Sequence, residues 1–104
     1  MPFERYEILL PLQYNDGTPV ELEKFQETRR ELVRRFGALT MDAPPASGLW
    51  MSGGREFTDE LIRFVVDTEA TPDTDEFFRA FKERLKARFR QIEIWITAYP
   101  IRVL

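Results

Sequence analysis

The stretch TPDTDEFFRAFKERLKARFRQIEIWITAY, residues 71–99, predicts a helix followed by a strand. Thr71 or Asp73 can cap the helix start. Apolar residues then recur at spacings of three, four and four, which predicts one buried helix face: Phe78, Phe81, Leu85 and Phe89. Acidic residues in the first turns and basic residues in the last ones complement the helix macrodipole. Gln91 to Tyr99 then alternates between apolar and polar residues, as a half-buried strand does.

A similar strand and helix precede this unit. Arg5 to Tyr14 alternates as a strand, with Tyr6, Ile8, Leu10 and Leu12 on one face. Thr18 and Glu21 have the spacing of a capping box, which predicts that a helix begins there. The predicted buried face of this helix contains Leu22, Phe25, Thr28 or Arg29, Leu32 and Phe36. Gly37 follows where a left-handed helix cap is favoured.

Two more strands are predicted between the helices. Ala38 to Asp42 forms a short one, and Glu56 to Asp67 contains the other, after a hairpin-like turn at Ser52-Gly53-Gly54. The order strand, helix, two strands, helix, strand predicts a ferredoxin-like βαββαβ sandwich of the α+β class. In this fold a four-stranded antiparallel sheet of order 4-1-3-2 carries both helices on one face. Residues 1–104 form one domain, whose predicted core contains Ile8, Leu10, Leu12, Leu22, Phe25, Leu32, Phe36, Ile62, Phe64, Val66, Phe78, Phe81, Leu85, Phe89, Ile92, Ile94 and Ile96.

The composition excludes several classes of function. The 104 residues include no histidine and no cysteine, which removes disulfides, thiolate metal sites and the commonest catalytic side chains. A formal charge of −3 argues against nucleic-acid binding, which needs clustered lysine and arginine. No apolar run reaches the roughly 18 residues of a membrane span, and the first residues do not resemble a signal peptide. The sequence therefore predicts a cytoplasmic protein without a metal or cofactor.

The sheet face opposite the helices contains more apolar residues than a solvated face should. Five residues predicted on this face would form a large patch if they lay together: Leu9, Leu61, Val65, Trp95 and Tyr99. A second copy of the chain, the Pro-rich loop or the tail Ile101–Leu104, or a bound ligand or RNA could cover it. RNA is disfavoured because the central strands offer no aromatic pair. The main hypothesis is a homodimeric accessory or interaction module that associates through this face, with an unidentified protein or small-molecule partner left open.

The alternative hypothesis is a cofactor-independent small-molecule enzyme or ligand-binding protein of the dimeric α/β-barrel type. Its pocket would lie under the hairpin Leu49–Arg55, and the residues predicted to contact the ligand are Trp50, Arg55, Glu60 and Arg63. A tryptophan on such a hairpin is more often a hydrophobic plug than a catalytic group. No serine has a base near it in the sequence, so no catalytic residue is assigned and a non-enzymatic role is favoured.

Two short motifs carry a resemblance to known proteins. Gly48-Leu49-Trp50 precedes Gly53 and Glu60, and Arg88-Phe89-Arg90-Gln91 ends the second predicted helix. The chain resembles a group of small uncharacterised bacterial proteins that combine a G-x-W turn with an R-F-x-Q motif, over roughly residues 37–97. The resemblance implies an α+β fold and supplies no activity. Arg90 stands where a glycine is expected after the helix.

Overall fold

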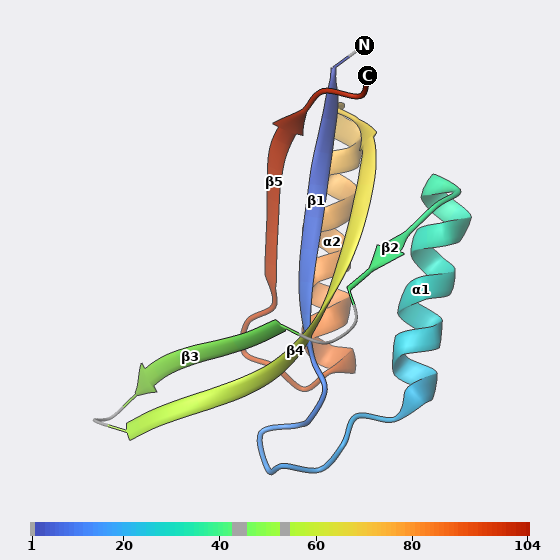
Figure 1. The fold of residues 1–104 in the computed structure, drawn as a ribbon. Helices are drawn as coiled ribbons and strands as arrows, with labels where there is room; N and C mark the ends of the chain where they lie inside the picture. The colour runs from blue at the N-terminus through green and yellow to red at the C-terminus, as the bar shows by residue number, and fades with distance from the viewer. Residues whose placement is uncertain (1, 43–45, 53–54) are drawn as a thin grey trace.

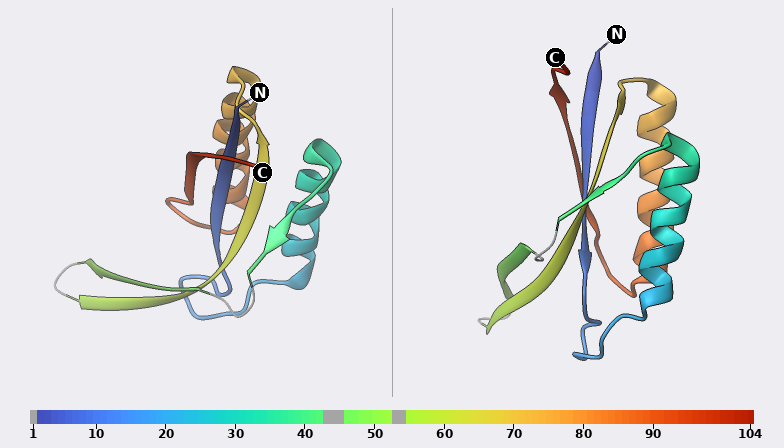
Figure 2. Two further views of the ribbon diagram at one scale, coloured as in Figure 1. Left: turned by 45° about the horizontal axis from the view of Figure 1, so that its top comes forward. Right: turned by 45° about the vertical axis from the view of Figure 1, so that its right-hand side comes forward.

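The computed structural model describes residues 2–42, 46–52 and 55–104, and side chains are described for 2–42 and 60–104. The elements in chain order are β1 (Phe3–Pro11), α1 (Leu22–Phe36), β2 (Thr40–Met41), β3 (Ala46–Ser52), β4 (Arg55–Glu69), α2 (Pro72–Arg88) and β5 (Trp95–Ile101). The strands form one antiparallel sheet of order β2-β4-β1-β5, and β3 also pairs with β4. Both helices lie on the same side of this sheet (Figures 1 and 2). The predicted ferredoxin-like α+β fold is confirmed.

The hydrophobic core lies between the sheet and the helices. Alternate residues of the central strand β1, among them Tyr6, Ile8 and Leu10, are buried there because their side chains point to the face that the helices cover (Figure 2). The ring of Tyr6 stacks on that of Phe78 with centroids 4.1 Å apart. The buried cluster consists of Tyr6, Ile8, Leu10, Tyr14, Val20, Leu32, Phe64, Val66, Phe78, Phe81, Leu85, Phe89 and Ile94.

Helix α2 begins as the sequence predicts. The Thr71 hydroxyl accepts a hydrogen bond from the Thr74 backbone N–H at 3.2 Å, and all four residues of the predicted apolar stripe are buried. After the helix, Arg90 has a φ of 54°, a left-handed conformation that a glycine would adopt without strain. The Arg90 guanidinium lies 4.5 Å from the centroid of the Tyr14 ring, a favourable contact that a glycine would lack.

Helix α1 begins at Leu22, so the capping box predicted for Thr18 and Glu21 is wrong. The preceding segment instead folds back on the end of β1: the Val20 N–H donates to the Leu12 carbonyl at 2.9 Å. The Glu21 carboxylate accepts from the Tyr14 hydroxyl at 2.5 Å, and this bond is the main cause of its lowered pKa. Leu22, predicted in the core, is 65% exposed as a result.

The structure confirms the predicted glycine cap at the end of α1 and corrects the predicted start of β5. Gly37 caps α1 with a φ of 81°, and its N–H donates to the Val33 carbonyl at 2.8 Å, as predicted. The alternation predicts Ile92 in the core of a strand that begins at Gln91, but the strand begins at Trp95 and Ile92 is 91% exposed. The preceding residues form a connection in which Glu93 pairs with Lys82 at 2.9 Å. This contact is the largest cause of the lowered pKa of Glu93.

Strand β4 is longer than its neighbour β1 and extends beyond it. Residues 61–69 pair with β1, whereas residues 55–61 pair with β3 in a hairpin. This hairpin projects away from the layer of the two helices (Figures 1 and 2). The pairing of Ser52 with Arg55 agrees with the predicted turn, although Gly53 and Gly54 lie outside the described residues. In the described part of the chain, no helix is both long and apolar enough to cross a membrane.

Candidate functional site

The outer face of the sheet, opposite the helices, is the candidate functional site. Its rows of side chains follow from the register of the strands. Leu9 lies between Trp95 on β5 and Arg63 on β4, and Glu7 lies between Thr97 and Val65. Further rows place Arg5 between Tyr99 and Asp67, and Pro11 beside Leu61. Because side chains alternate along a strand, the odd-numbered residues of these three strands share this face.

A polar network occupies the middle of the outer face. The Glu7 carboxylate accepts a hydrogen bond from the Tyr99 hydroxyl at 2.8 Å and lies 3.4 Å from an Arg63 guanidinium nitrogen. The Arg63 Nε donates to an Asp42 carboxylate oxygen at 2.6 Å. This network joins β1, β4 and β5 to the residue that follows β2, so it fixes how four segments present their polar groups.

A second ion pair lies beside this network. Arg5 donates two hydrogen bonds to the Asp67 carboxylate, at 2.7 and 2.9 Å. Such a two-point contact orients both groups. The hydrogen bond with Asp67 is the largest cause of the raised pKa of Arg5. Both side chains are more than one-third exposed, so water screens the pair and its contribution to stability is small.

The five residues predicted as an interface share the outer face, but the polar network divides them. Trp95 is 61% exposed and pairs with the half-buried Leu9, so these two form one apolar area. Val65 is only 9% exposed and lies beside Glu7. Tyr99 is 40% exposed and pairs with Arg5. The fifth, Leu61, is half-buried beside Pro11 at the end of the sheet.

The structure does not bring together the two predicted ligand residues whose side chains it describes, Glu60 and Arg63. Arg63 belongs to the outer-face network, whereas Glu60 is an odd number of residues away on β4 and therefore lies on the opposite face. Trp50 pairs with Phe57 in the hairpin, and Arg55 pairs with Ser52. The side chains of Trp50 and Arg55, and the predicted pocket under the hairpin, lie outside the described residues.

Sequence reasoning missed part of the network. Strand alternation alone puts Glu7, Arg63 and Tyr99 on one face, and that signal could have found their contacts. Asp42 could not be assigned, because its contact depends on the register of β2 against β4. One alternative was that the tail Ile101–Leu104 covers the outer face. Val103 and Leu104 are exposed and do not cover the sheet. Among the described residues, no three acidic side chains gather as a metal site would require.

Comparison with known proteins shows the fold. The CutA1 divalent cation tolerance protein from Thermus thermophilus is 20% identical, with a TM-score of 0.64 over 97% of this chain and 85% of that one. Rice (Oryza sativa) CutA1 is 14% identical, with a TM-score of 0.66 over 99% and 83%. A phage SAM lyase in its apo state is 14% identical, with a TM-score of 0.70 over 98% and 90%. No family model and no curated protein matches the sequence.

Proposed function

We propose that this chain is a small accessory protein that associates with copies of itself through the outer sheet face. The simplest assembly is a homodimer, located in the cytoplasm as the sequence predicts. The observation that carries the proposal is the exposure of Trp95, which lies beside Leu9 on a face that neither α1 nor α2 covers (Figure 2). Tryptophan is the residue type most enriched among the anchors of protein interfaces.

The charges of the outer face favour contact with a second copy. Two guanidinium groups, of Arg5 and Arg63, face three carboxylates, of Glu7, Asp42 and Asp67, which leaves one net negative charge. These groups are already paired with each other, so two copies can approach with little repulsion. An exposed aromatic anchor beside polar groups with satisfied hydrogen bonds is the composition that protein interfaces show.

The Trp95→Glu variant tests this proposal. The substitution places a charge where a second copy would bury an aromatic ring, so we expect the assembly to weaken by about thirtyfold or more in dissociation constant. The mass from light scattering after size exclusion should fall towards the monomer value of 12.3 kDa. Trp95 is mostly exposed in the single chain, so the chain should still fold after the substitution.

The Ile92→Glu variant is the matched control. Ile92 is also exposed and lies only three residues before Trp95, but it precedes the strand and is off the sheet. It should keep the mass of the unmodified chain. A monomeric unmodified chain at all concentrations would overturn the proposal, and so would an unchanged mass of the Trp95→Glu variant. The unmodified chain could also form a closed assembly larger than a dimer. If Trp95→Glu dissociates that assembly, the result would support association through the outer face and correct the number of copies.

A second candidate function is the small-molecule enzyme or ligand-binding protein with a pocket under the Leu49–Arg55 hairpin. What supports it is that the phage SAM lyase, whose structure was solved in complex with S-methyl-5′-thioadenosine, shares this fold at a TM-score of 0.65. That complex holds a nucleoside thioether in a protein of this fold. Fold alone does not transfer the activity, so this candidate needs a direct binding test.

The two tryptophans permit such a test, because each can be observed alone. In a Trp95→Phe variant, the emission of Trp50 should change on addition of S-methyl-5′-thioadenosine if the hairpin covers a ligand. In the matched Trp50→Phe variant, the emission of Trp95 should stay constant. If Trp50 emission does not respond at saturating concentrations of the nucleoside, binding of this ligand under the hairpin is excluded.

A further inference from the structure

A groove runs along α2 on the helix side of the sheet, from the start of α2 to the side of the edge strand β5. It consists of two hollows of about 340 and 220 Å³ that share Asp75 and Arg79 among their lining residues. The larger one lies at the start of α2, beside Glu4 and Glu76. The smaller one lies against the middle of β5 and is too small for most drug-sized ligands. A groove of this size fits a single metabolite of about amino-acid size.

The floor of the smaller hollow is aromatic and has one fixed polar group. The stacked rings of Tyr6 and Phe78 lie beneath it, and Ile96 and Ala98 of β5 form its side. The Tyr6 hydroxyl donates a short hydrogen bond to the Asp75 Oδ1. Burial, followed by this bond, raises the pKa of Tyr6. The protonated hydroxyl holds the Asp75 carboxylate in place through this bond.

The charged groups of the groove are ordered along one face of α2. Asp75, Arg79 and Lys82 stand at spacings of four and three, which places them on the same side of the helix. Lys82 is neutralised by Glu93 at 2.9 Å. Within the described part of the chain, Arg79 forms no ion pair and the Asp75 Oδ2 accepts no hydrogen bond. One cationic fork and one anionic oxygen, one helical turn apart, are therefore available to a ligand beside an apolar floor.

We infer that this groove binds a free α-amino acid with an apolar or aromatic side chain. Arg79 would hold the ligand carboxylate, because a guanidinium fork matches a carboxylate in geometry and charge. Asp75 would accept from the ligand ammonium, and Glu4 and Glu76 add negative charge at that end. The ligand side chain would lie on the Tyr6–Phe78 floor. This site is independent of self-association, because Trp95 and Leu9 lie on the opposite face of the sheet.

Three probes that differ by one charged group test the inference. They are L-phenylalanine, 2-phenylethylamine, which lacks the carboxylate, and 3-phenylpropionate, which lacks the ammonium. The measurement is the shift of the backbone amide signals of residues 96–98 in the labelled full chain during titration. We expect L-phenylalanine to bind at least about tenfold more tightly than either truncated probe, since each loses one charge-assisted contact.

Two variants and one control assign the roles of the charged groups. Arg79→Gln should remove the preference for L-phenylalanine over 2-phenylethylamine, and Asp75→Asn should remove the preference over 3-phenylpropionate. The control Arg30→Gln removes one positive charge, as Arg79→Gln does, but at an exposed position of α1. It should leave the affinities for all three probes unchanged. Equal binding of the three probes, tightest binding of 3-phenylpropionate, or no shift of these amides up to the solubility of the probes would overturn the inference.

Discussion

Replacing Leu32 by alanine is expected to lower the free energy of unfolding by about 2–5 kcal/mol, whereas the same change at Leu22 should cost less than about 0.5 kcal/mol. Both residues lie on α1, and leucine and alanine are both good helix formers, so helix propensity contributes little to the difference. Leu32 is fully buried in the core cluster, and its truncation leaves a cavity. Leu22 is 65% exposed at the first position of the helix.

Urea unfolding of the two variants beside the unmodified chain, followed by circular dichroism, measures both values. A loss of about 2–5 kcal/mol is a large fraction of the total stability of a small domain, so the midpoint of Leu32→Ala should move far below that of Leu22→Ala. Equal midpoints for the two variants would contradict the placement of α1. In that case Leu22 would have to be buried in solution by contacts that the single chain lacks.

This pair of leucines also shows how far the sequence predicts the fold. Helical spacing identifies the buried face of a helix but not where the helix begins, and here the apparent capping box extended the helix too early. The segment before the true start is held by a bond between residues eight apart, from the Val20 N–H to the Leu12 carbonyl, that the helical spacing does not contain. The same limit applies to Ile92. The apolar alternation of Ile92 and Ile94 lies before Trp95, where the strand begins. Local periodicity therefore predicted the two helices and the four strands of the order β2-β4-β1-β5, but not β3. Tertiary contacts decided where the predicted elements end.

The candidate site was predictable to a similar degree. Strand alternation placed Trp95, Tyr99, Leu9 and Val65 on one face, which the register confirms. The division of that face by polar contacts was not predictable, because Glu7 meets Arg63 only when β1 and β4 pair in one particular register. A shift of one residue would move either side chain to the helix side of the sheet. The sequence thus predicts which residues share a face of the sheet. Which side chains contact each other on that face can be seen only in the structure.

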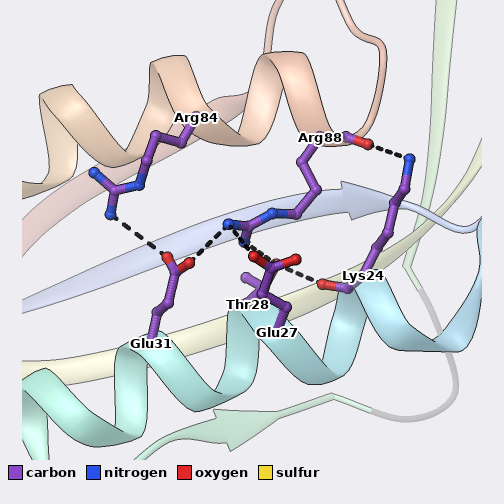
Figure 3. A network of polar contacts seen from close by, with 6 residues as sticks. All are labelled: Lys24, Glu27, Thr28, Glu31, Arg84 and Arg88. Carbon is purple, nitrogen blue, oxygen red and sulfur yellow. Dashed lines mark hydrogen bonds and ion pairs between the residues drawn. The ribbon is translucent and has the colours of Figure 1, made fainter.

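The polar contacts between the two helices centre on one guanidinium group, that of Arg88 (Figure 3). Its side chain is only 11% exposed. It donates to the Thr28 hydroxyl at 2.8 Å and to the Glu31 carboxylate at 2.7 Å, and lies 3.4 Å from Glu27. The fully buried Thr28 hydroxyl in turn donates to the Lys24 carbonyl. A single side chain on α2 therefore satisfies polar groups on two turns of α1.

We expect Arg88→Ala to lower the free energy of unfolding by about 2–3 kcal/mol, because a hydrogen bond to a charged group contributes about 1.5–3 kcal/mol. Its removal leaves the half-buried Glu31 carboxylate with only the 3.5 Å contact to Arg84. Glu31 keeps some access to water, which limits the loss. The bond from the Lys24 ammonium to residue 88 uses the backbone carbonyl and should survive the substitution. Lys86→Ala, which breaks only the exposed pair with Glu83, should cost less than about 0.5 kcal/mol.

The comparison with Lys86 isolates the contribution of the network. Both substitutions remove one positive charge from the last turn of α2, so the change in the helix dipole interaction is similar in the two variants. Arg88→Lys keeps the charge but lacks the planar fork that reaches Thr28 and Glu31 together, so it should recover only part of the loss. Thermal unfolding of the three variants measures the order of stability. If Arg88→Ala were no less stable than Lys86→Ala, the contacts of the Arg88 guanidinium would contribute no more than an exposed ion pair does.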